Sequence, residues 1–176
     1  RSLTAVGPEM FTVPFWTPAM CAAVIRAAEA VGGFEPHPDD PVPGHEVSLA
    51  AISPALYSRF EIDLGVRLWP LLQTRWPLVE YCGLRDAFVI KYEEGGQTEL
   101  RLHHDVAQVS ASMKLNSEYT GAELEFPQQG YTNTDLDVGS LLVWPSLVTP
   151  PHRTLPLQSG VKYGLTIWFE IPEQYG

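Results

Sequence analysis

The second half of the chain, from Pro77 onward, consists of short apolar segments interrupted at close intervals by Gly, Pro, Asn and Asp. The whole chain holds 16 prolines and 14 glycines, which disfavours a bundle of long helices. Segments of this length and composition predict strands. The predicted strands are Phe88–Tyr92, Val106–Leu115, Ala122–Phe126, Gly139–Trp144 and Tyr163–Phe169. Such a series is typical of a β-sandwich or jelly roll.

Two helices are predicted ahead of these strands. The first covers Thr17–Val31, with its threonine as the N-cap, a proline in the first turn and two glycines after the last residue. The second begins with Ser53 as the cap and runs toward Trp76, broken or kinked at Pro70. Helices followed by strands predict an α+β chain.

The segment Glu35–Gly44 has four prolines in ten residues and is predicted to be a loop. It is a candidate lid that orders over a functional site when substrate binds, with an idle surface loop as the alternative. His37 and His45 flank this region, and we assign them no role because isolated loop histidines are ordinary surface residues.

A single domain is expected from the length of 176 residues, of which 45% are hydrophobic. The 11 Lys and Arg residues are outnumbered by 21 Asp and Glu, so the formal net charge is −10. This balance argues against a binder of nucleic acid or anionic membrane. No apolar run is long enough to span a bilayer, and the sequence leaves the oligomeric state open.

Cys21 and Cys82 provide neither a disulfide framework nor metal-ligand spacing. Two buried thiols in a reducing compartment is the favoured interpretation. The chain begins at Arg1 without a charged-then-apolar leader, which indicates an excised domain, a trimmed chain or a processed product. We therefore expect a cytoplasmic location.

The candidate metal-ligating residues begin with the motif His103-His104-Asp105. In a strand, residues two apart point to the same side, so His103 and Asp105 can converge on one ion while His104 points away. His152 follows a later apolar strand and adds a second imidazole. Two imidazoles and one carboxylate form the facial triad of non-haem Fe(II) oxygenases. Lys162 enters the last predicted strand, where its cation can pair with a ligand carboxylate.

Seven sequence phrases carry a resemblance to a known family. They are Phe88-Val-Ile-Lys-Tyr92, His103-His-Asp105, Lys114-Leu-Asn116, Tyr119-Thr-Gly-Ala-Glu-Leu124, Gly139-Ser-Leu-Leu-Val-Trp-Pro145, His152 and Ser159-Gly-Val-Lys-Tyr163. The stretch that contains them resembles the 2-oxoglutarate- and Fe(II)-dependent dioxygenases of the prolyl/lysyl hydroxylase type. The spacing is most similar to the catalytic domain of the procollagen lysyl hydroxylases.

The resemblance implies a double-stranded β-helix, or jelly roll, in about residues 86–171, with helical support from about residues 1–85. It implies that His103, Asp105 and His152 ligate Fe(II) and that Lys162 binds the distal carboxylate of 2-oxoglutarate. Lysine at this position agrees with the collagen-type prolyl 4-hydroxylases, whereas lysyl hydroxylases and oxygen-sensing prolyl hydroxylases use arginine. Lysine and arginine both supply a cation, so 2-oxoglutarate remains the implied co-substrate. The assignment to the lysyl hydroxylase subfamily, however, does not hold.

Three further residues are implied to contact the co-substrate. Tyr92 matches a tyrosine that reaches 2-oxoglutarate in the lysyl hydroxylases. Ser112 stands where those enzymes carry an asparagine, and Thr166 stands where oxygen-sensing prolyl hydroxylases carry a threonine.

Arg101 and Trp144 are candidate substrate residues at the mouth of the site, and His104 is interpreted as a supporting or surface residue. Four apolar residues of the late strands are expected to form barrel core and not substrate wall: Leu141, Val143, Trp168 and Phe169.

The activity implied is hydroxylation of an unactivated C–H bond with dioxygen, releasing succinate and CO₂, with ascorbate as a candidate reductant. The implied substrate is a lysyl or prolyl side chain, free or peptide-bound, or a small amino-acid-derived molecule. Asp105 disfavours halogenation, because halogenases of this superfamily need a vacant position there. Desaturation or cyclisation by the same site, and a non-catalytic jelly-roll binding module, remain as alternatives.

Overall fold

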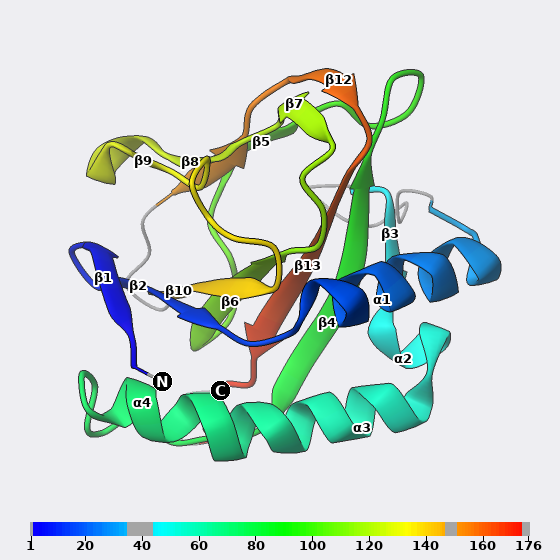
Figure 1. The fold of residues 1–176 in the computed structure, drawn as a ribbon. Coiled ribbons are helices and arrows are strands. Elements are labelled where there is room, and N and C mark those ends of the chain that lie inside the picture. The colour runs from blue at the N-terminus through cyan, green and yellow to red at the C-terminus, as the bar shows by residue number, and fades with distance from the viewer. Residues whose placement is uncertain (1, 35–43, 147–150, 174–176) are drawn as a thin grey trace.

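The computed structural model describes residues 2–34, 44–146 and 151–173, arranged as Figure 1 shows. A seven-stranded sheet runs through the molecule in the order β1-β2-β10-β6-β13-β4-β3, and neighbouring strands are antiparallel. Its strands are β1 (Thr4–Gly7), β2 (Met10–Pro14), β10 (Ser140–Pro145), β6 (Val109–Lys114), β13 (Lys162–Phe169), β4 (Leu84–Tyr92) and β3 (Glu46–Ser48).

A smaller four-stranded sheet has the order β5-β11-β8-β9, and a two-stranded ribbon pairs β12 with β7. These strands are β5 (Leu100–His103), β11 (His152–Thr154), β8 (Leu124–Phe126), β9 (Tyr131–Thr132), β12 (Leu157–Gly160) and β7 (Tyr119–Gly121), and a 3₁₀ turn spans Pro127–Gln129. The smaller sheet lies across from β10, β6 and β13 in Figure 1. Residues of both sheets line one cavity, which therefore lies between them.

The helices pack on the other face of the large sheet. They are α1 (Pro18–Val31), α2 (Leu49–Ile52), α3 (Pro54–Asp63) and α4 (Trp69–Gln73), with a π-helical turn at Leu64–Leu68 between the last two. Both predicted N-caps form, since the hydroxyls of Thr17 and Ser53 each accept a backbone N–H at 3.1 Å. Helices on one face of a jelly roll are the α+β arrangement that the sequence predicts.

The second predicted helix changes geometry just before Pro70, and it ends earlier than Trp76. Pro70 has no N–H to donate to the preceding turn, so the chain widens into the π-helical turn there and α4 starts afresh with the proline at its N-terminus.

Strand β13 separates the core from the cavity by simple alternation. Leu165, Ile167 and Phe169 are fully buried in the core shared with the helices. Lys162, Gly164, Thr166 and Trp168 line the cavity instead. Side chains of a strand alternate between its faces, so this single strand serves both layers.

All five predicted strands form, as β4, β6, β8, β10 and β13, and three of them begin more than one residue away from the predicted start. Strand β6 starts at Val109 and not at Val106, because the preceding residues form an irregular segment that carries Asp105 toward the cavity. Strand β8 starts at Leu124 and not at Ala122, since Ala122 has a φ of 54°, which is incompatible with an extended strand.

The first part of the chain also contributes strands that the sequence pattern does not reveal. Strands β1 and β2 precede the first helix, and β2 pairs with β10 in the large sheet. Strand β3 lies between α1 and α2 and pairs with β4. The N-terminal region is therefore not helical support alone. Division into one domain stays a prediction.

Cys21 is buried and Cys82 is exposed, and both thiols are free. The prediction of two buried thiols is therefore wrong for Cys82, which sits in the irregular connection before β4. None of the described helices is long and apolar enough to cross a membrane. The candidate lid lies, apart from Gly44, outside the described residues, as does His37.

Candidate metal centre and cavity

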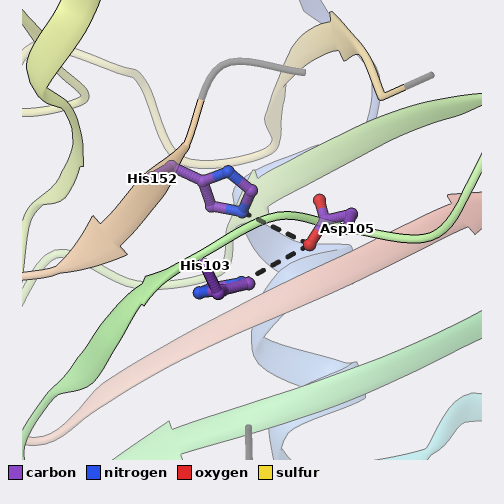
Figure 2. Close-up of side chains that lie close together, drawn as sticks. All are labelled: His103, Asp105 and His152. Atoms are coloured by element: carbon purple, nitrogen blue, oxygen red, sulfur yellow. Dashed lines mark ion pairs between the residues drawn. The ribbon is translucent and has the colours of Figure 1, made fainter. Parts of the chain in front are cut away.

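Three predicted ligands converge where β5 meets β11. His103 ends β5 and lies directly opposite His152, the first residue of β11. The Nε2 atoms of both histidines lie 3.4 Å from Oδ1 of Asp105, as Figure 2 shows. One ligand atom from each residue lies within 4.8 Å of the others. Asp105 follows β5 and does not belong to it, so cross-strand pairing and a loop, and not strand alternation alone, bring the three together.

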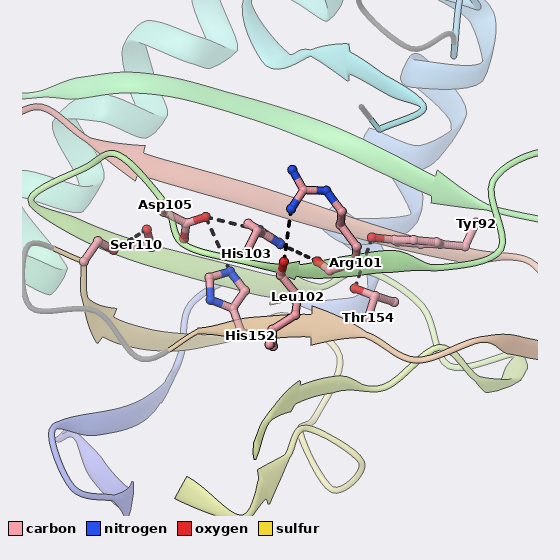
Figure 3. A network of polar contacts seen from close by, with 9 residues as sticks. Tyr92, Arg101, Leu102, His103, Asp105, Ser110, His152 and Thr154 are labelled. Carbon is pink, nitrogen blue, oxygen red and sulfur yellow. Dashed lines mark hydrogen bonds and ion pairs between the residues drawn. The ribbon is translucent and has the colours of Figure 1, made fainter. Parts of the chain in front are cut away.

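The tautomer of His103 is suited to metal binding. Its Nδ1 lies 2.8 Å from the carbonyl oxygen of Arg101 and donates a hydrogen bond there. Nε2 is therefore the ring nitrogen that faces Asp105, and it can ligate a metal once it has lost its proton. Burial by itself lowers the pKa of His103. Hydrogen bonds to Asp105 and to the Arg101 carbonyl outweigh burial and raise that pKa above its ordinary value. Figure 3 shows this network.

Asp105 is held as a carboxylate. Burial alone would raise its pKa, but hydrogen bonds from His103 and His152 outweigh burial and hold the pKa well below its usual range. Within the described residues, Oδ2 of Asp105 is buried and accepts no hydrogen bond. Ser110 lies beside Asp105 in Figure 3, and its buried hydroxyl accepts a hydrogen bond of 2.5 Å from Ser146.

Aromatic rings fix the position of His152. Its imidazole stacks on Phe126 and meets Trp144 edge-on, with 5.0 Å between ring centroids in each case. It also meets the His103 ring edge-on at 4.4 Å. A cation with bonds of about 2.1 Å places two ligand atoms at right angles about 3 Å apart, which is close to the 3.4 Å between Asp105 and each histidine. The three residues therefore fit a cation that keeps further coordination positions open toward the cavity.

The cavity beside this centre has a volume of about 270 Å³. Lys162 lines it with only 6% of its surface exposed. Its Nζ donates to the Ala122 carbonyl at 2.6 Å and lies 5.1 Å from the centre of the Tyr92 ring. No carboxylate of the described residues lies within ion-pair distance of this ammonium. Burial, with a smaller contribution from Lys114, lowers its pKa to about 7.

The other three co-substrate candidates share this wall. Tyr92 pairs with Lys162 in the sheet, and its buried hydroxyl donates to Thr154 at 3.1 Å. Burial raises the pKa of Tyr92. Ser112 and Thr166 are direct cross-strand partners, and both line the cavity. The structure thus brings all four co-substrate candidates together.

The candidate substrate residues are placed differently. Trp144 lines the cavity but is 2% exposed and packs against His152, so it lies in the wall beside the metal position and not at the mouth. Arg101 is exposed and is not among the described residues that line the cavity. His104 is exposed and lines the same cavity, but it is not among the three residues whose ligand atoms converge.

Sequence reasoning missed several cavity residues. Trp168, predicted to be core, lines the cavity and meets Phe88 edge-on at 5.1 Å, whereas the other three residues predicted as core are fully buried. Counting by twos from Lys162 along the strand would have found it. Thr154 stands two residues after His152 on the same strand and could have been found in the same way. Arg85 carried no signal that local alternation could show.

Comparisons with known proteins agree with the resemblance. No protein-family model matches the chain. The chain is 25% identical over 178 residues to a procollagen lysyl hydroxylase and glycosyltransferase of Acanthamoeba polyphaga mimivirus. The match covers 91% of this chain, which spans about a fifth (19%) of the length of that relative.

Solved structures share the fold at low sequence identity. A viral collagen prolyl hydroxylase from Paramecium bursaria Chlorella virus-1, in complex with 2-oxoglutarate, has a TM-score of 0.64 at 15% identity, covering 94% of this chain and 98% of that one. A Pseudomonas putida prolyl-4-hydroxylase has a TM-score of 0.61 at 19% identity, covering 93% of each. A Burkholderia pseudomallei oxidoreductase of the 2OG-Fe(II) oxygenase family has a TM-score of 0.62 at 15% identity. The match covers 92% of this chain and 85% of that one. The predicted jelly-roll fold and the similarity to these hydroxylases are confirmed.

Proposed function

We propose that the chain is a 2-oxoglutarate- and Fe(II)-dependent dioxygenase that hydroxylates an unactivated C–H bond. The proposed substrate is an amino-acid side chain, lysyl or prolyl, peptide-bound or free, or a small amino-acid-derived molecule. One oxygen atom of dioxygen enters the substrate, and the other enters succinate as 2-oxoglutarate loses CO₂. Ascorbate is a proposed reductant that keeps the iron ferrous.

The observation that carries this proposal is a pair of complementary features in one cavity. His103, Asp105 and His152 provide a facial set of ligands for a divalent cation. Lys162 provides a buried ammonium that no described carboxylate neutralises. A buried charge without a partner is costly, so a ligand carboxylate is the expected counter-ion. A metal chelator that also carries a distal carboxylate satisfies both features.

Each group of residues has a distinct task in this proposal. Fe(II) with bound 2-oxoglutarate supplies the oxidative chemistry, while the protein supplies position and exclusion of water. Lys162 would hold the distal carboxylate, with Thr166 and Ser112 on the adjoining wall. Tyr92 and Thr154 would close the far end, since their hydroxyls already bond to each other.

The named relatives suggest which substrates to test first. The mimivirus relative is named a procollagen lysyl hydroxylase, and two of the solved structures are named prolyl hydroxylases. Peptides that contain lysine or proline, and the corresponding free amino acids, are therefore the first panel.

Anaerobic titration with Fe(II) and 2-oxoglutarate tests the proposal. The protein with both should develop the visible charge-transfer absorption of iron-bound 2-oxoglutarate, and admission of oxygen should then release succinate. Zn(II) in place of Fe(II) is the matched control, because it can occupy the same ligands without giving colour or turnover. Absence of the absorption with Fe(II) would instead favour a non-catalytic binding module.

A further inference from the structure

Arg85 reaches the cavity because of an irregularity in strand pairing. Trp168 of β13 pairs with Asp86 of β4, but the next residue, Phe169, pairs with Leu84, so Arg85 is an extra residue on β4. In a regular strand Arg85 would share the core-facing side with Ala87. The bulge breaks the alternation: Leu84 packs against the core, and Arg85 lines the cavity. Bulges beside active sites commonly re-aim a side chain in this way.

The surroundings of Arg85 suit an external anion. Its side chain is exposed, and no ion pair joins it to a carboxylate of the described residues. Next to it the cavity wall is apolar, since Trp168 and Phe88 meet edge-on there. Val106, which is 66% exposed, is a further apolar residue of the cavity lining. The chain has a formal net charge of −10, yet no acidic residue of its described part forms an ion pair with this arginine.

Arg85 and Lys162 lie at opposite ends of the cavity wall. Lys162 pairs with Tyr92 at one end of β4, while Arg85 stands seven residues earlier on that strand. At about 3.3 Å per residue their backbones are roughly 20 Å apart. A five-carbon co-substrate that reaches Lys162 from the metal therefore leaves Arg85 available for a different anionic group.

We propose that Arg85 selects substrates that carry a carboxylate and holds that carboxylate at the cavity mouth. The apolar carbons of the substrate would lie along Trp168 and Phe88, beside the metal position. A guanidinium binds a carboxylate through two parallel hydrogen bonds, which fixes orientation as well as charge. The proposal rests on the proposed function, because it assigns the substrate class of that same site. The carboxylate belongs either to a free amino acid or to an acidic side chain of a peptide.

Matched probe pairs test this inference on the anaerobic Fe(II)–2-oxoglutarate complex. One arm compares N-acetyl-proline and N-acetyl-lysine with their carboxamides. The other compares short proline- or lysine-containing peptides that differ by Asp against Asn. Dissociation constants are measured by calorimetry for the wild type, Arg85→Gln, Arg85→Lys and Arg26→Gln. Arg26 is an exposed residue of α1 and controls for loss of one positive charge away from the cavity.

We expect the carboxylate member of at least one arm to bind about tenfold more tightly than its amide partner. Arg85→Gln should remove this preference, Arg85→Lys should retain part of it, and Arg26→Gln should leave it unchanged. The responding arm identifies the source of the carboxylate. Equal binding, or no binding, in every wild-type pair overturns the inference, as does a preference that survives in Arg85→Gln. The charge-transfer absorption recorded before any probe is added reports separately on the proposed function.

Discussion

Replacing Lys162 with alanine should weaken 2-oxoglutarate binding far more than Fe(II) binding. The ammonium is buried, and the described residues offer it a backbone carbonyl but no carboxylate. Lowering its pKa from 10.5 to about 7 corresponds to roughly 5 kcal/mol spent on keeping the charge in the ligand-free cavity. An ion pair with a ligand carboxylate would offset part of this free-energy cost. A hydrogen bond to a charged group contributes about 1.5–3 kcal/mol, so Lys162→Ala should raise the 2-oxoglutarate dissociation constant at least about tenfold.

The same lysine should make 2-oxoglutarate binding depend on pH. Below about pH 7 the Lys162 side chain is already protonated, so its titration does not affect affinity. A bound carboxylate favours the charged form and raises the pKa, so binding above pH 7 takes up a proton. Affinity should therefore fall by up to about tenfold per pH unit above that value, until the pKa of the complex is reached.

Lys162→Arg separates this effect from other titrations in the cavity. Arginine stays charged, so the pH dependence above about pH 7 should disappear while binding persists. Lys114, Glu123 and the tyrosines Tyr92 and Tyr119, which surround the ammonium, are the same in both proteins. The histidine ligands are also the same in the wild type and in Lys162→Arg.

The assay is anaerobic titration of the charge-transfer absorption with 2-oxoglutarate from about pH 6 to pH 9. Lys91→Ala is the matched control, because Lys91 neighbours Tyr92 on β4 but pairs with Glu29 at 2.7 Å and does not line the cavity. An unchanged binding curve for Lys162→Ala would refute the assignment of this lysine. Identical pH profiles for the wild type and Lys162→Arg would refute the titration argument.

Substitutions at four residues test the metal centre. Asp105→Ala should abolish Fe(II)-dependent succinate release with the circular dichroism spectrum retained, and turnover near the wild-type rate would contradict the metal site. His103→Ala should lose Fe(II) affinity in equilibrium dialysis while His104→Ala keeps most of it; equal losses would mean that the motif faces the other way. Ser110→Ala should weaken Fe(II) binding about tenfold, because its hydroxyl lies beside the Asp105 carboxylate, and Ser110→Thr should restore it. No change in Ser110→Ala would leave that hydroxyl without a role at the metal.

The residues that meet in the metal centre could be predicted because their chemistry is local and distinctive. His103 and Asp105 lie two apart, and His152 was identified by its place after an apolar strand. The pairing that sets His152 opposite His103 could not be predicted, since it depends on long-range strand register. The placement of Arg85 depends on register in the same way, because its bulge exists only relative to β13.

The strands β1 and β2 were missed for a related reason. Each is short, the turn between them contains Pro8 and β2 ends at Pro14, so the local pattern indicates a loop. Strand β2 is held by pairing with β10, far along the chain, and β1 is held by pairing with β2. The helix caps at Thr17 and Ser53, by contrast, depend on neighbouring residues only, and both were predicted.

The two-sided character of β13 limits how this protein can diverge. Exchanging Thr166 or Trp168 alters the chemistry of the cavity without removing an atom from the helix-facing core. Deleting a single residue between Lys162 and Leu165, however, would put the two parts of the strand out of phase. Either Lys162 would turn toward the helices, or Leu165 and Ile167 would turn toward the cavity. Substrate range can thus drift by substitution here, whereas insertions and deletions must be confined to the connecting loops.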